Sequence, residues 1–279
     1  MNNKIYPCIW FNNNALEAAN FYCSIFKNSK LLNQNPTVIN FEVENQIFMC
    51  LNGGPHFTPN PTISFYVTCE TENEIDSLWM ALIKNGSIRM PLNKYAWSKK
   101  YGWVDDKYGV SWQLTIGSIA EIGQKITPAL LYSGKQFGKA KEAVTVYSEI
   151  FKPSEIHFLF PYPETDVLNN GKIAHGQISL LNQKFIVMDG GNMNEFSFSE
   201  GVSLVVSCDN QEEIDHYWTN LTKEGQESQC GWLKDKYGVS WQIVPSKLGK
   251  LMSNPEKATR VMSEIFKMKK INIKVLENA

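Results

Sequence analysis

The sequence predicts an α+β fold made of two tandem domains, each built from a pair of βαβββ modules. The run DKYGVSWQ at 106–113 returns unchanged at 235–242, so the chain contains an internal repeat. Other similar segments recur in the same order, as 63–70 with 202–209 and 74–86 with 213–225. Within each copy, the apolar pattern changes from strand-like to helix-like and back again twice.

The repeat also sets the expected domain boundaries. We predict one domain over 1–117, a second over 125–246 and a C-terminal helical tail over 247–279. Residues 117–124 are polar and include glycine, which suits a short linker. The segment MPLNKYAWSK at 90–99 has no counterpart in the second copy, so we interpret it as an insertion. The 279 residues provide enough chain for two separately buried cores.

The first module of each copy is predicted from apolar spacing. Residues 5–11 are apolar and β-prone, which indicates a strand. A helix follows, with Asn13 or Asn14 as its expected cap and apolar residues at helical spacing. Those apolar residues are Leu16, Ala19, Cys23 and Phe26. A hairpin is expected over 37–44 and 46–52, around Asn45.

The second module repeats this order. Residues 62–69 indicate a strand, and Thr71 with Glu74 forms a capping-box signature for a helix that continues to Lys84. Strands near 101–104 and 109–115 should meet at a turn over 106–109. In the tail, a helix beginning at Pro255 places a stripe of apolar residues against the second domain. That stripe comprises Ala258, Val261, Met262, Ile265 and Phe266.

The corresponding hairpin of the second copy, 172–181 and 183–189, shows which side of its sheet is polar. Ala174, Gly176, Ile178 and Leu180 alternate with His175, Gln177 and Ser179. Since successive residues of a strand point to opposite faces, one face is for packing and the other is available to a polar group.

Composition and charge exclude several classes of partner. Hydrophobic residues make up 43% and charged residues 20% of the chain, and the formal net charge is −1. Without a basic stripe, we expect neither a nucleic acid nor a membrane as partner. We find no signal peptide and no transmembrane segment. The six cysteines form no C-x-x-C pair, so reduced, mostly buried thiols and a cytoplasmic location are expected.

Several motifs together indicate a known family. Phe21-Tyr22 follows Pro7 by fourteen residues, and DKYGVSWQ has the length of the D-P-D-G-x-x-I-E strand of the glyoxalase fold. The NGG and DGG strand ends, the run at 230–243 and the tail at 254–279 resemble the PhnB-like, 3-demethylubiquinone-9 3-methyltransferase-like branch of the glyoxalase / bleomycin-resistance / dioxygenase (vicinal oxygen chelate) superfamily. The resemblance implies curved mixed sheets that enclose a cleft, with helices on the outer face.

The resemblance also implies four metal positions in each copy. In this sequence they are Pro7, Cys50, Ile63 and Gln113 in the first copy, and Pro128, Val187, Val202 and Gln242 in the second. None of the eight is His, Asp or Glu, and a catalytic metal needs around three protein ligands. We therefore expect no metal in the usual position and no cofactor.

Aromatic and polar residues near these positions are the candidate ligand contacts. His175 with Asp189 could orient a ligand or act as a general base, although we favour a hydrogen-bonded structural histidine. Trp112 and Trp241 should point to the opposite, core-facing side. The residues expected to line the cleft are Pro7, Cys50, Asn52, Trp103, Gln113, Pro128, Tyr132, His175, Gln177, Asp189, Trp232 and Gln242.

Three functions are consistent with these residues. The first is metal-independent binding of a small, partly apolar molecule. The second is an enzyme with a displaced or absent metal site that uses His175, Asp189 and Gln242. The third is a structural or partner-binding domain with a filled cleft. No G-x-G-x-x-G motif follows a strand, so methyltransferase activity is not supported. The two copies form an internal pseudo-dimer, which leaves the chain either monomeric or dimeric.

Overall fold

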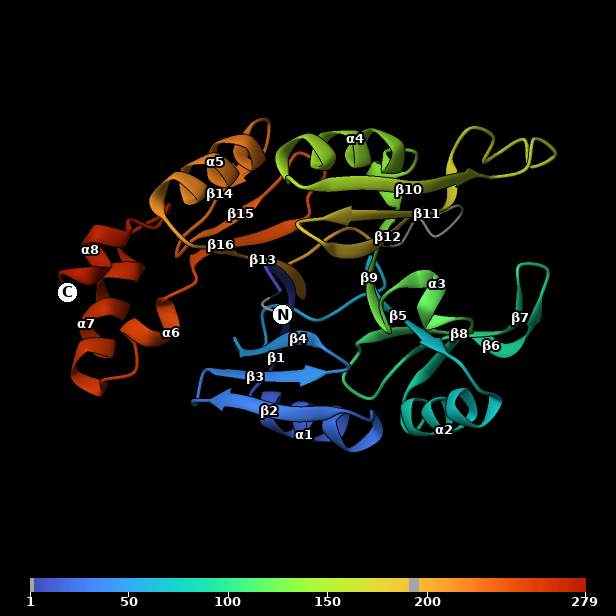
Figure 1. Cartoon of the computed structure of the whole chain (residues 1–279), viewed down its shortest axis with the longest axis horizontal. Helices are drawn as coiled ribbons and strands as arrows, with labels where there is room; N and C mark the ends of the chain where they lie inside the picture. Colours follow the sequence, from blue (N-terminus) through green and yellow to red (C-terminus); the bar gives the residue numbers. More distant parts are fainter. Residues whose placement is uncertain (1–2, 191–195) are drawn as a thin grey trace. The chain divides into compact units, whose positions relative to one another are not determined.

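The computed structural model describes residues 3–190 and 196–279, and the chain divides into two compact units (Figure 1). Unit 1 is Pro7–Val202, and unit 2 joins Ser203–Ala279 to the N-terminal residues up to Tyr6. No helix among the described residues combines the length and the apolar character needed to span a bilayer.

The chain begins with a βαβββ module. Its elements are β1 (Ile5–Phe11), α1 (Ala15–Ile25), β2 (Ser29–Gln34), β3 (Val38–Val43) and β4 (Gln46–Asn52). β1 pairs with β4 in parallel, and β4, β3 and β2 form an antiparallel meander. The turn between β3 and β4 places Glu44 and Asn45 at φ 49° and 67°, the left-handed pair that a two-residue hairpin turn requires.

Unit 1 also contains an eight-stranded sheet to which both copies of the repeat contribute. Its strands, in spatial order, are β10 (Ser154–Pro161), β11 (Ile173–Leu180), β12 (Gln183–Asp189), β9 (Ile126–Tyr132), β5 (Ile63–Cys69), β8 (Ser111–Ile116), β7 (Ser98–Asp105) and β6 (Ser87–Tyr95). The two halves meet where β5 and β9 pair antiparallel, with Ser64 opposite Ala129. The second module of the first copy and the first module of the second copy therefore form one continuous sheet.

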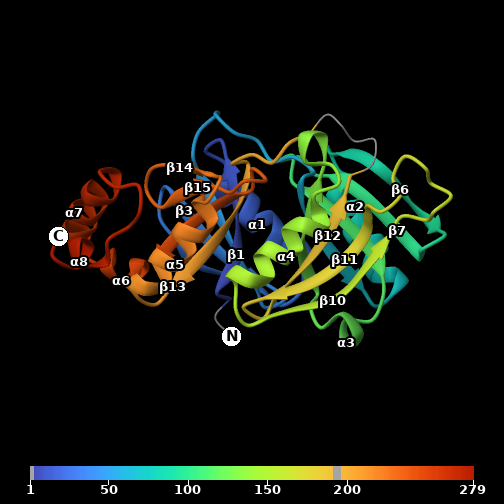
Figure 2. The same cartoon turned by 90° about the horizontal axis from the view of Figure 1, so that it is seen from above.

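Helices cover one face of this sheet. They are α2 (Glu72–Leu82) over the β5–β8 half and α4 (Ala140–Ile150) over the β10–β12 half (Figures 1 and 2). α2 packs so closely that a Cβ at Gly102 would lie 2.6 Å from the Trp79 ring. The short α3 (Ile119–Ile122) lies between the two copies, and η1 (Gly134–Gln136) precedes α4.

Unit 2 contains one more βαβββ module and the tail. The module comprises β13 (Val202–Cys208), α5 (Gln211–Thr222), β14 (Gln226–Glu227), β15 (Trp232–Lys234) and β16 (Ser240–Pro245). The tail forms α6 (Leu248–Leu251), α7 (Pro255–Phe266) and α8 (Ile273–Glu277). The predicted α+β class with βαβββ modules is thus confirmed.

The repeated DKYGVSWQ motif forms a turn held by a buried aspartate. Asp106 Oδ1 accepts hydrogen bonds from the backbone N–H groups of Tyr108 and Val110, at 2.8 and 3.1 Å. Asp106 Oδ2 accepts one from Trp112 Nε1, at 2.9 Å, and one from the Tyr22 hydroxyl, at 2.7 Å. Asp235 repeats the backbone and tryptophan bonds in unit 2. The identity of the two motifs therefore has a structural cause, since every donor inside this turn needs the same acceptor.

Details of three predicted elements differ from the structure. Asn14 is the N-cap of α1, but its side chain makes no capping hydrogen bond. The segment 90–99 forms the end of the β6–β7 hairpin. In the tail, Val261 and Ile265 are buried, whereas Phe266 is 66% exposed, so the buried stripe of α7 is narrower than expected.

Candidate ligand-binding site

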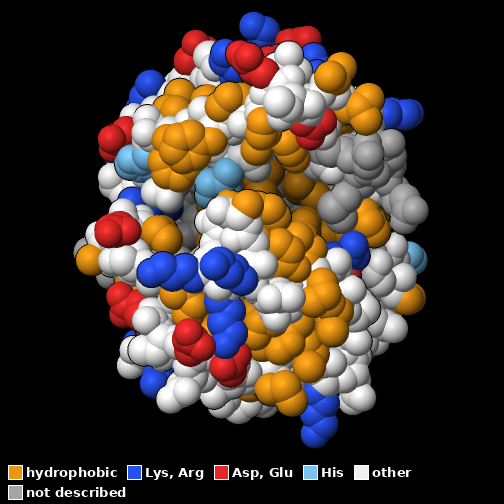
Figure 3. All heavy atoms as spheres, turned by 90° about the vertical axis from the view of Figure 1, so that its right-hand side faces the viewer, with side chains coloured by type: hydrophobic (Ala, Val, Ile, Leu, Met, Phe, Trp, Pro, Cys, Tyr) orange, Lys and Arg blue, Asp and Glu red, His pale blue; other side chains and the backbone are white. Residues whose placement is uncertain are grey.

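The eight-stranded sheet has a helix-covered face and an open face. Register pairs Phe65 with Trp112 and Tyr66 with Gln113. Trp112 packs on Phe65 and on Tyr22 of α1, in the core on the helix-covered side, so Tyr66 and Gln113 point the other way. β10–β12 and β6–β8 form the two ends of this sheet (Figure 1). The side of the molecule on which these strands lie is hollowed (Figure 3). Hydrophobic side chains gather around the hollow, and histidine lies among them (Figure 3).

A short chain of hydrogen bonds occupies the centre of the open face. The Tyr101 hydroxyl donates to Gln113 Oε1 at 2.6 Å, and Gln113 Nε2 donates to Ser64 Oγ at 2.8 Å. Unit 2 repeats part of this chain, because Gln242 Nε2 donates to Ser203 Oγ at 3.0 Å. At the two glutamine positions, the amide is therefore held by neighbouring hydroxyl groups.

His175 lies on the same open face of the sheet. Its ring centroid is 5.8 Å from that of Tyr66 and 5.7 Å from that of Phe158, with an angle of 22° to the Phe158 ring. Among the described residues, the imidazole forms no hydrogen bond. Burial lowers the pKa of His175 from its usual 6.5, so the ring is neutral near pH 7 and offers one donor and one acceptor.

Aromatic and sulfur-containing side chains line the rest of this face. Tyr101, Trp103 and Leu131 form a buried cluster, and the Trp103 indole donates to Ser111 Oγ at 2.7 Å. The partly buried residues packed against the cluster are Tyr66, Met90, Tyr95 and Met188. Such a wall suits an apolar or aromatic ligand, because rings and thioethers offer large contact areas.

One ion pair lies at the edge of this face. Arg89 Nη2 lies 2.6 Å from Asp105 Oδ2, and the Arg89 guanidinium also lies 4.8 Å from the centroid of the Phe196 ring. Asp105 is opposite Ser111 in register, which places it on the open side. The two opposite charges neutralise each other, so this pair gives the face no net charge.

Four of the predicted cleft residues of unit 1 lie on the open face: Trp103, Gln113, His175 and Gln177. Trp103 is opposite Gln113 in register, and Gln177 follows His175 by two residues on β11. In unit 2, Trp232 is opposite Gln242, so these two share a face of that sheet. The predicted core positions of Trp112 and Trp241 are confirmed, at 1% and 0% exposure.

Four other predicted cleft residues lie on helix-covered faces, which corrects the expectation. Pro128 is opposite Phe65, and Tyr132 is opposite Asp189 and packs its ring against Phe198. Cys50 is buried under α1, and burial raises the pKa of its thiol. Pro7 precedes Ile9, the register partner of Cys50, by two residues and points the same way. For Pro128 and Tyr132 on β9, the prediction used the wrong strand parity, because Leu131, one residue before Tyr132, lies in the cluster on the open face. Pro7 and Cys50 lie on β1 and β4, outside the eight-stranded sheet that carries the hollow.

Asp189 and Asn52 accept hydrogen bonds at helix N-termini, each on the helix-covered face of its own sheet. Asp189 Oδ1 accepts hydrogen bonds from Gly138 N at 2.8 Å and Ala140 N at 3.2 Å, while Oδ2 accepts one from Ile173 N at 2.8 Å. Asn52 Oδ1 likewise accepts from Ala15 N, the first residue of α1, at 3.0 Å. The hypothesis that Asp189 assists His175 is therefore wrong, because Asp189 binds α4 on the opposite face.

The sequence interpretation missed several residues that shape the open face. They are Ser64, Tyr66, Tyr101, Leu131, Phe158 and Met188. Strand alternation would have identified Tyr101. It precedes Trp103 by two residues on β7, and residues two apart on a strand lie on the same face. Phe158 could not be placed, since a register shift in β10 lies between Ile156 and Phe158.

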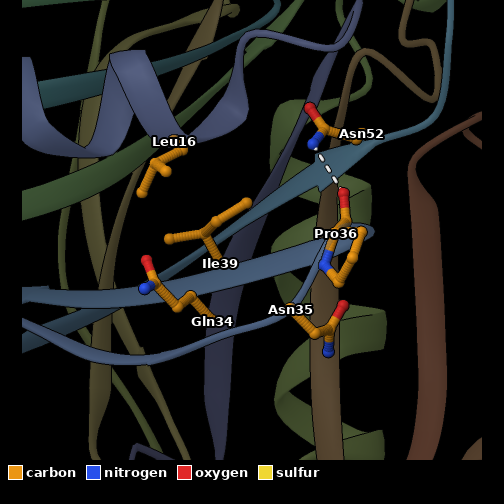
Figure 4. A pocket seen from close by; sticks show the side chains of 6 residues that line it. All are labelled: Leu16, Gln34, Asn35, Pro36, Ile39 and Asn52. Carbon is orange, nitrogen blue, oxygen red and sulfur yellow. Dashed lines mark hydrogen bonds between the residues drawn. The ribbon is translucent and has the colours of Figure 1, made fainter.

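A second depression lies beside α1. It has a volume of about 360 Å³ and opens between Leu16 on α1, Ile39 on β3 and the β2–β3 turn (Figure 4). Asn52 crosses one end, where its Nδ2 donates to the Pro36 carbonyl at 2.8 Å. It has no aromatic wall and no titratable side chain, so the open face of the eight-stranded sheet is the stronger candidate site.

Metal-binding side chains are not gathered anywhere in the described ranges. Within 3–190 and 196–279, no group of three or more His, Cys, Asp or Glu side chains could hold a metal ion. All six cysteines are free thiols, and four of them are buried. Besides hydroxyl, amide and thioether groups, the open face carries the imidazoles of His175 and His157 and the Asp105 carboxylate, and these are not gathered into the set of about three ligands that a divalent metal site needs.

Comparison with known proteins places the chain in a family. A family model described as 3-demethylubiquinone-9 3-methyltransferase matches twice, over residues 3–115 and 124–244. The chain belongs to this family. The PhnB protein of Bacillus cereus is 42% identical over 41% of this chain and 100% of its own, with a TM-score of 0.39. Glyoxalase I from Zea mays is 9% identical but matches 87% of this chain and 94% of its own, with a TM-score of 0.54.

Each match has a structural counterpart. The two copies of the family domain contribute one module each, β5–β8 and β9–β12, to the eight-stranded sheet. The glyoxalase I match extends across both copies, so the predicted glyoxalase-like fold is confirmed. At this identity, the match shows the fold alone.

Proposed function

We propose that this protein binds a small, partly apolar molecule on the open face of the eight-stranded sheet, without a metal. The observation that carries the proposal is the neutral His175, flanked by Tyr66 and Phe158 and facing a wall built on Tyr101, Trp103 and Leu131. A few polar groups among aromatic side chains are typical of small-molecule sites.

The rival hypothesis of an enzyme using His175, Asp189 and Gln242 has less support. A general base needs a partner that orients it, and Asp189 already accepts three backbone hydrogen bonds, two at the start of α4 and one from Ile173 at the start of β11. The third possibility, a filled cleft, is disfavoured by the hollow itself (Figure 3).

The test is binding of Nile red, an uncharged aromatic dye that fluoresces in apolar sites, to protein dialysed against EDTA. We expect saturable binding with the same affinity before and after addition of zinc or nickel. Met188→Lys, which places a charge on the open face, should weaken binding at least about tenfold. The matched control is Met80→Lys, because Met80 is 64% exposed on α2, on the other side of the sheet.

Two results would argue against the proposal. Binding that disappears in EDTA and returns with metal would indicate a metalloprotein. Equal binding by wild type and Met188→Lys, with both folded by circular dichroism, would place the dye elsewhere on the chain.

We further propose a cytoplasmic location and action as a single chain. Six free thiols support the location, because reduced cysteines are usual in the cytosol. The site itself needs no second chain, since both copies of the domain already contribute strands to it.

A further inference from the structure

The rings around the hollow favour a flat ligand. His175 lies nearly parallel to Phe158, and Phe158 stacks on Phe160 with their centroids 4.8 Å apart. On the β6–β7 side, Tyr95 stacks on Trp97 at 5.0 Å and an angle of 24°. Phe160 and Trp97 are 59% and 65% exposed, so both stacks present ring surface to solvent. A planar aromatic molecule buries most area against such surfaces.

The electrostatics of the face favour a ligand without charge. Arg89 is neutralised by Asp105. His157 Nε2 is already within 2.6 Å of Ser179 Oγ. The ring contacts of His175 are to uncharged aromatic side chains. A charged ligand placed between these rings would lose its hydration without gaining a counter-ion, which is costly.

The hydrogen-bonding groups of His175 indicate one further feature of the ligand. The imidazole is partly buried, and none of the described residues bonds to it. By contrast, Gln113 and Trp103 on the same face are already bonded to Ser64, Tyr101 and Ser111. A ligand hydroxyl that bonds to His175 would therefore use a group that the described part of the chain leaves unused.

From these three observations we infer that the ligand is an uncharged, planar aromatic molecule whose ring carries a hydroxyl group hydrogen-bonded to His175. This inference rests on the proposed function and adds to it the chemical class of the ligand.

The experiment compares three probes of equal ring size near neutral pH: naphthalene, 2-naphthol and 2-naphthoate. Affinities are measured by intrinsic tryptophan fluorescence and equilibrium dialysis on the whole 279-residue chain. We expect 2-naphthol to bind about fivefold more tightly than naphthalene, the effect of one hydrogen bond. We expect 2-naphthoate to bind at least about tenfold more weakly than 2-naphthol, because its charge lacks a partner.

Variants of His175 assign this preference to one side chain. His175→Leu should lose the preference for 2-naphthol, and the readout is the ratio of the 2-naphthol and naphthalene affinities of the same variant. His175→Gln keeps a donor and an acceptor, so it should recover part of that preference and serves as a second variant if His175→Leu does not fold. Met188→Lys should weaken binding of all three probes, as it does for the dye.

The outcomes separate the inference from the proposed function. If 2-naphthoate binds as tightly as 2-naphthol, or if His175→Leu keeps the preference, the inference is overturned while aromatic binding still stands. If none of the probes binds to the wild type, or Met188→Lys changes no affinity, the proposed function itself fails.

Discussion

At the scale of single residues, His175 is the titratable group whose surroundings matter most for the site. Burial lowers its pKa from 6.5. The neighbouring Tyr66 and Tyr101 have pKa values that burial raises, so they stay neutral where His175 titrates. Protonation of His175 therefore changes the charge of this group of three side chains, and the two tyrosines do not.

This shift predicts how stability responds to acid. Because the folded-state pKa lies below the unfolded value, His175 stabilises the folded protein fully above about pH 6.5, and this contribution is lost as pH falls through the folded-state pKa. Relative to His175→Gln, the wild type should lose up to about 1.4 kcal/mol of unfolding free energy per pH unit in that range. Urea denaturation at a series of pH values measures the difference.

The control for this prediction is His216→Gln, since His216 is exposed on α5. Subtracting it removes the general effects of acid and of losing a histidine. A difference between wild type and His175→Gln that stays constant from neutral pH to pH 5 would show that protonation of His175 is not coupled to folding.

Two neighbouring aspartates, Asp105 and Asp106, have different surroundings. Asp106 is buried, which raises its pKa to about 6, although hydrogen bonds from Tyr22 and Trp112 act in the opposite direction. Asp105, one residue earlier, pairs with Arg89 on the open face of the sheet. The aspartate that begins the motif DKYGVSWQ therefore stabilises a turn. The recurrence of the motif predicts this turn twice, but it does not predict where a ligand binds.

At the scale of elements, Asp189 joins the end of β12 to the start of α4. Its carboxylate accepts from Gly138, Ala140 and Ile173, and the carboxylate charge also suits the positive end of the helix. Asn52 has the same position at the end of β4, with one backbone acceptance from Ala15. In both copies, the side chain at the end of this strand accepts a backbone hydrogen bond from the start of the helix. Asp189 accepts three backbone hydrogen bonds in all, and Asn52 accepts one.

This difference predicts unequal effects of two substitutions. Asp189→Ala should lower the free energy of unfolding by about 3 kcal/mol, since it leaves three backbone donors without their acceptor. Asn52→Ala should lower it by about 1 kcal/mol. Chemical denaturation gives both values. Nile red affinity of folded Asp189→Ala should equal that of the wild type, and a large loss of affinity at unchanged folding would restore Asp189 to the site.

The sequence predicted the elements that depend on local signals. The capping box is one, as Glu74 N donates to Thr71 Oγ1 at 3.2 Å. The hairpin turn at Asn182, with φ 66°, is another. β2 was not assigned a range because five of its six residues are exposed, so it lacks the alternation that marks a half-buried strand.

The site was predicted less well, and the cause is strand parity. A shift of one residue along a strand moves every side chain to the other face. Pro128 and Leu131 belong to the same strand, β9, yet only Leu131 lies in the cluster on the open face. Parity on β9 is fixed by its pairing with β5 and β12, contacts that join residues far apart in the sequence.

At the scale of the whole molecule, the repeat boundary and the structural boundary differ. The family model separates the copies between residues 115 and 124, whereas the compact units separate at Val202 and Ser203. The reason is the pairing of β5 with β9, which joins a strand of one copy to a strand of the other. In a single copy, β5 would be an edge strand with one side unpaired. Six of its seven residues are buried in this structure, and the seventh is Tyr66.

This architecture predicts that the copies hold together after the chain is cut between them. A protease site inserted in 118–124 should be cleavable, because Ala120, Glu121 and Gly123 are exposed. After cleavage, the two fragments should co-elute at equal amounts in size-exclusion chromatography and keep their affinity for Nile red. Ala129→Pro in the same background should separate or unfold them, since proline removes a backbone donor and is not tolerated in a central strand. Separation of the unsubstituted fragments in native buffer would instead mean that each copy is stable alone, and that the β5–β9 ladder contributes little to holding the site together.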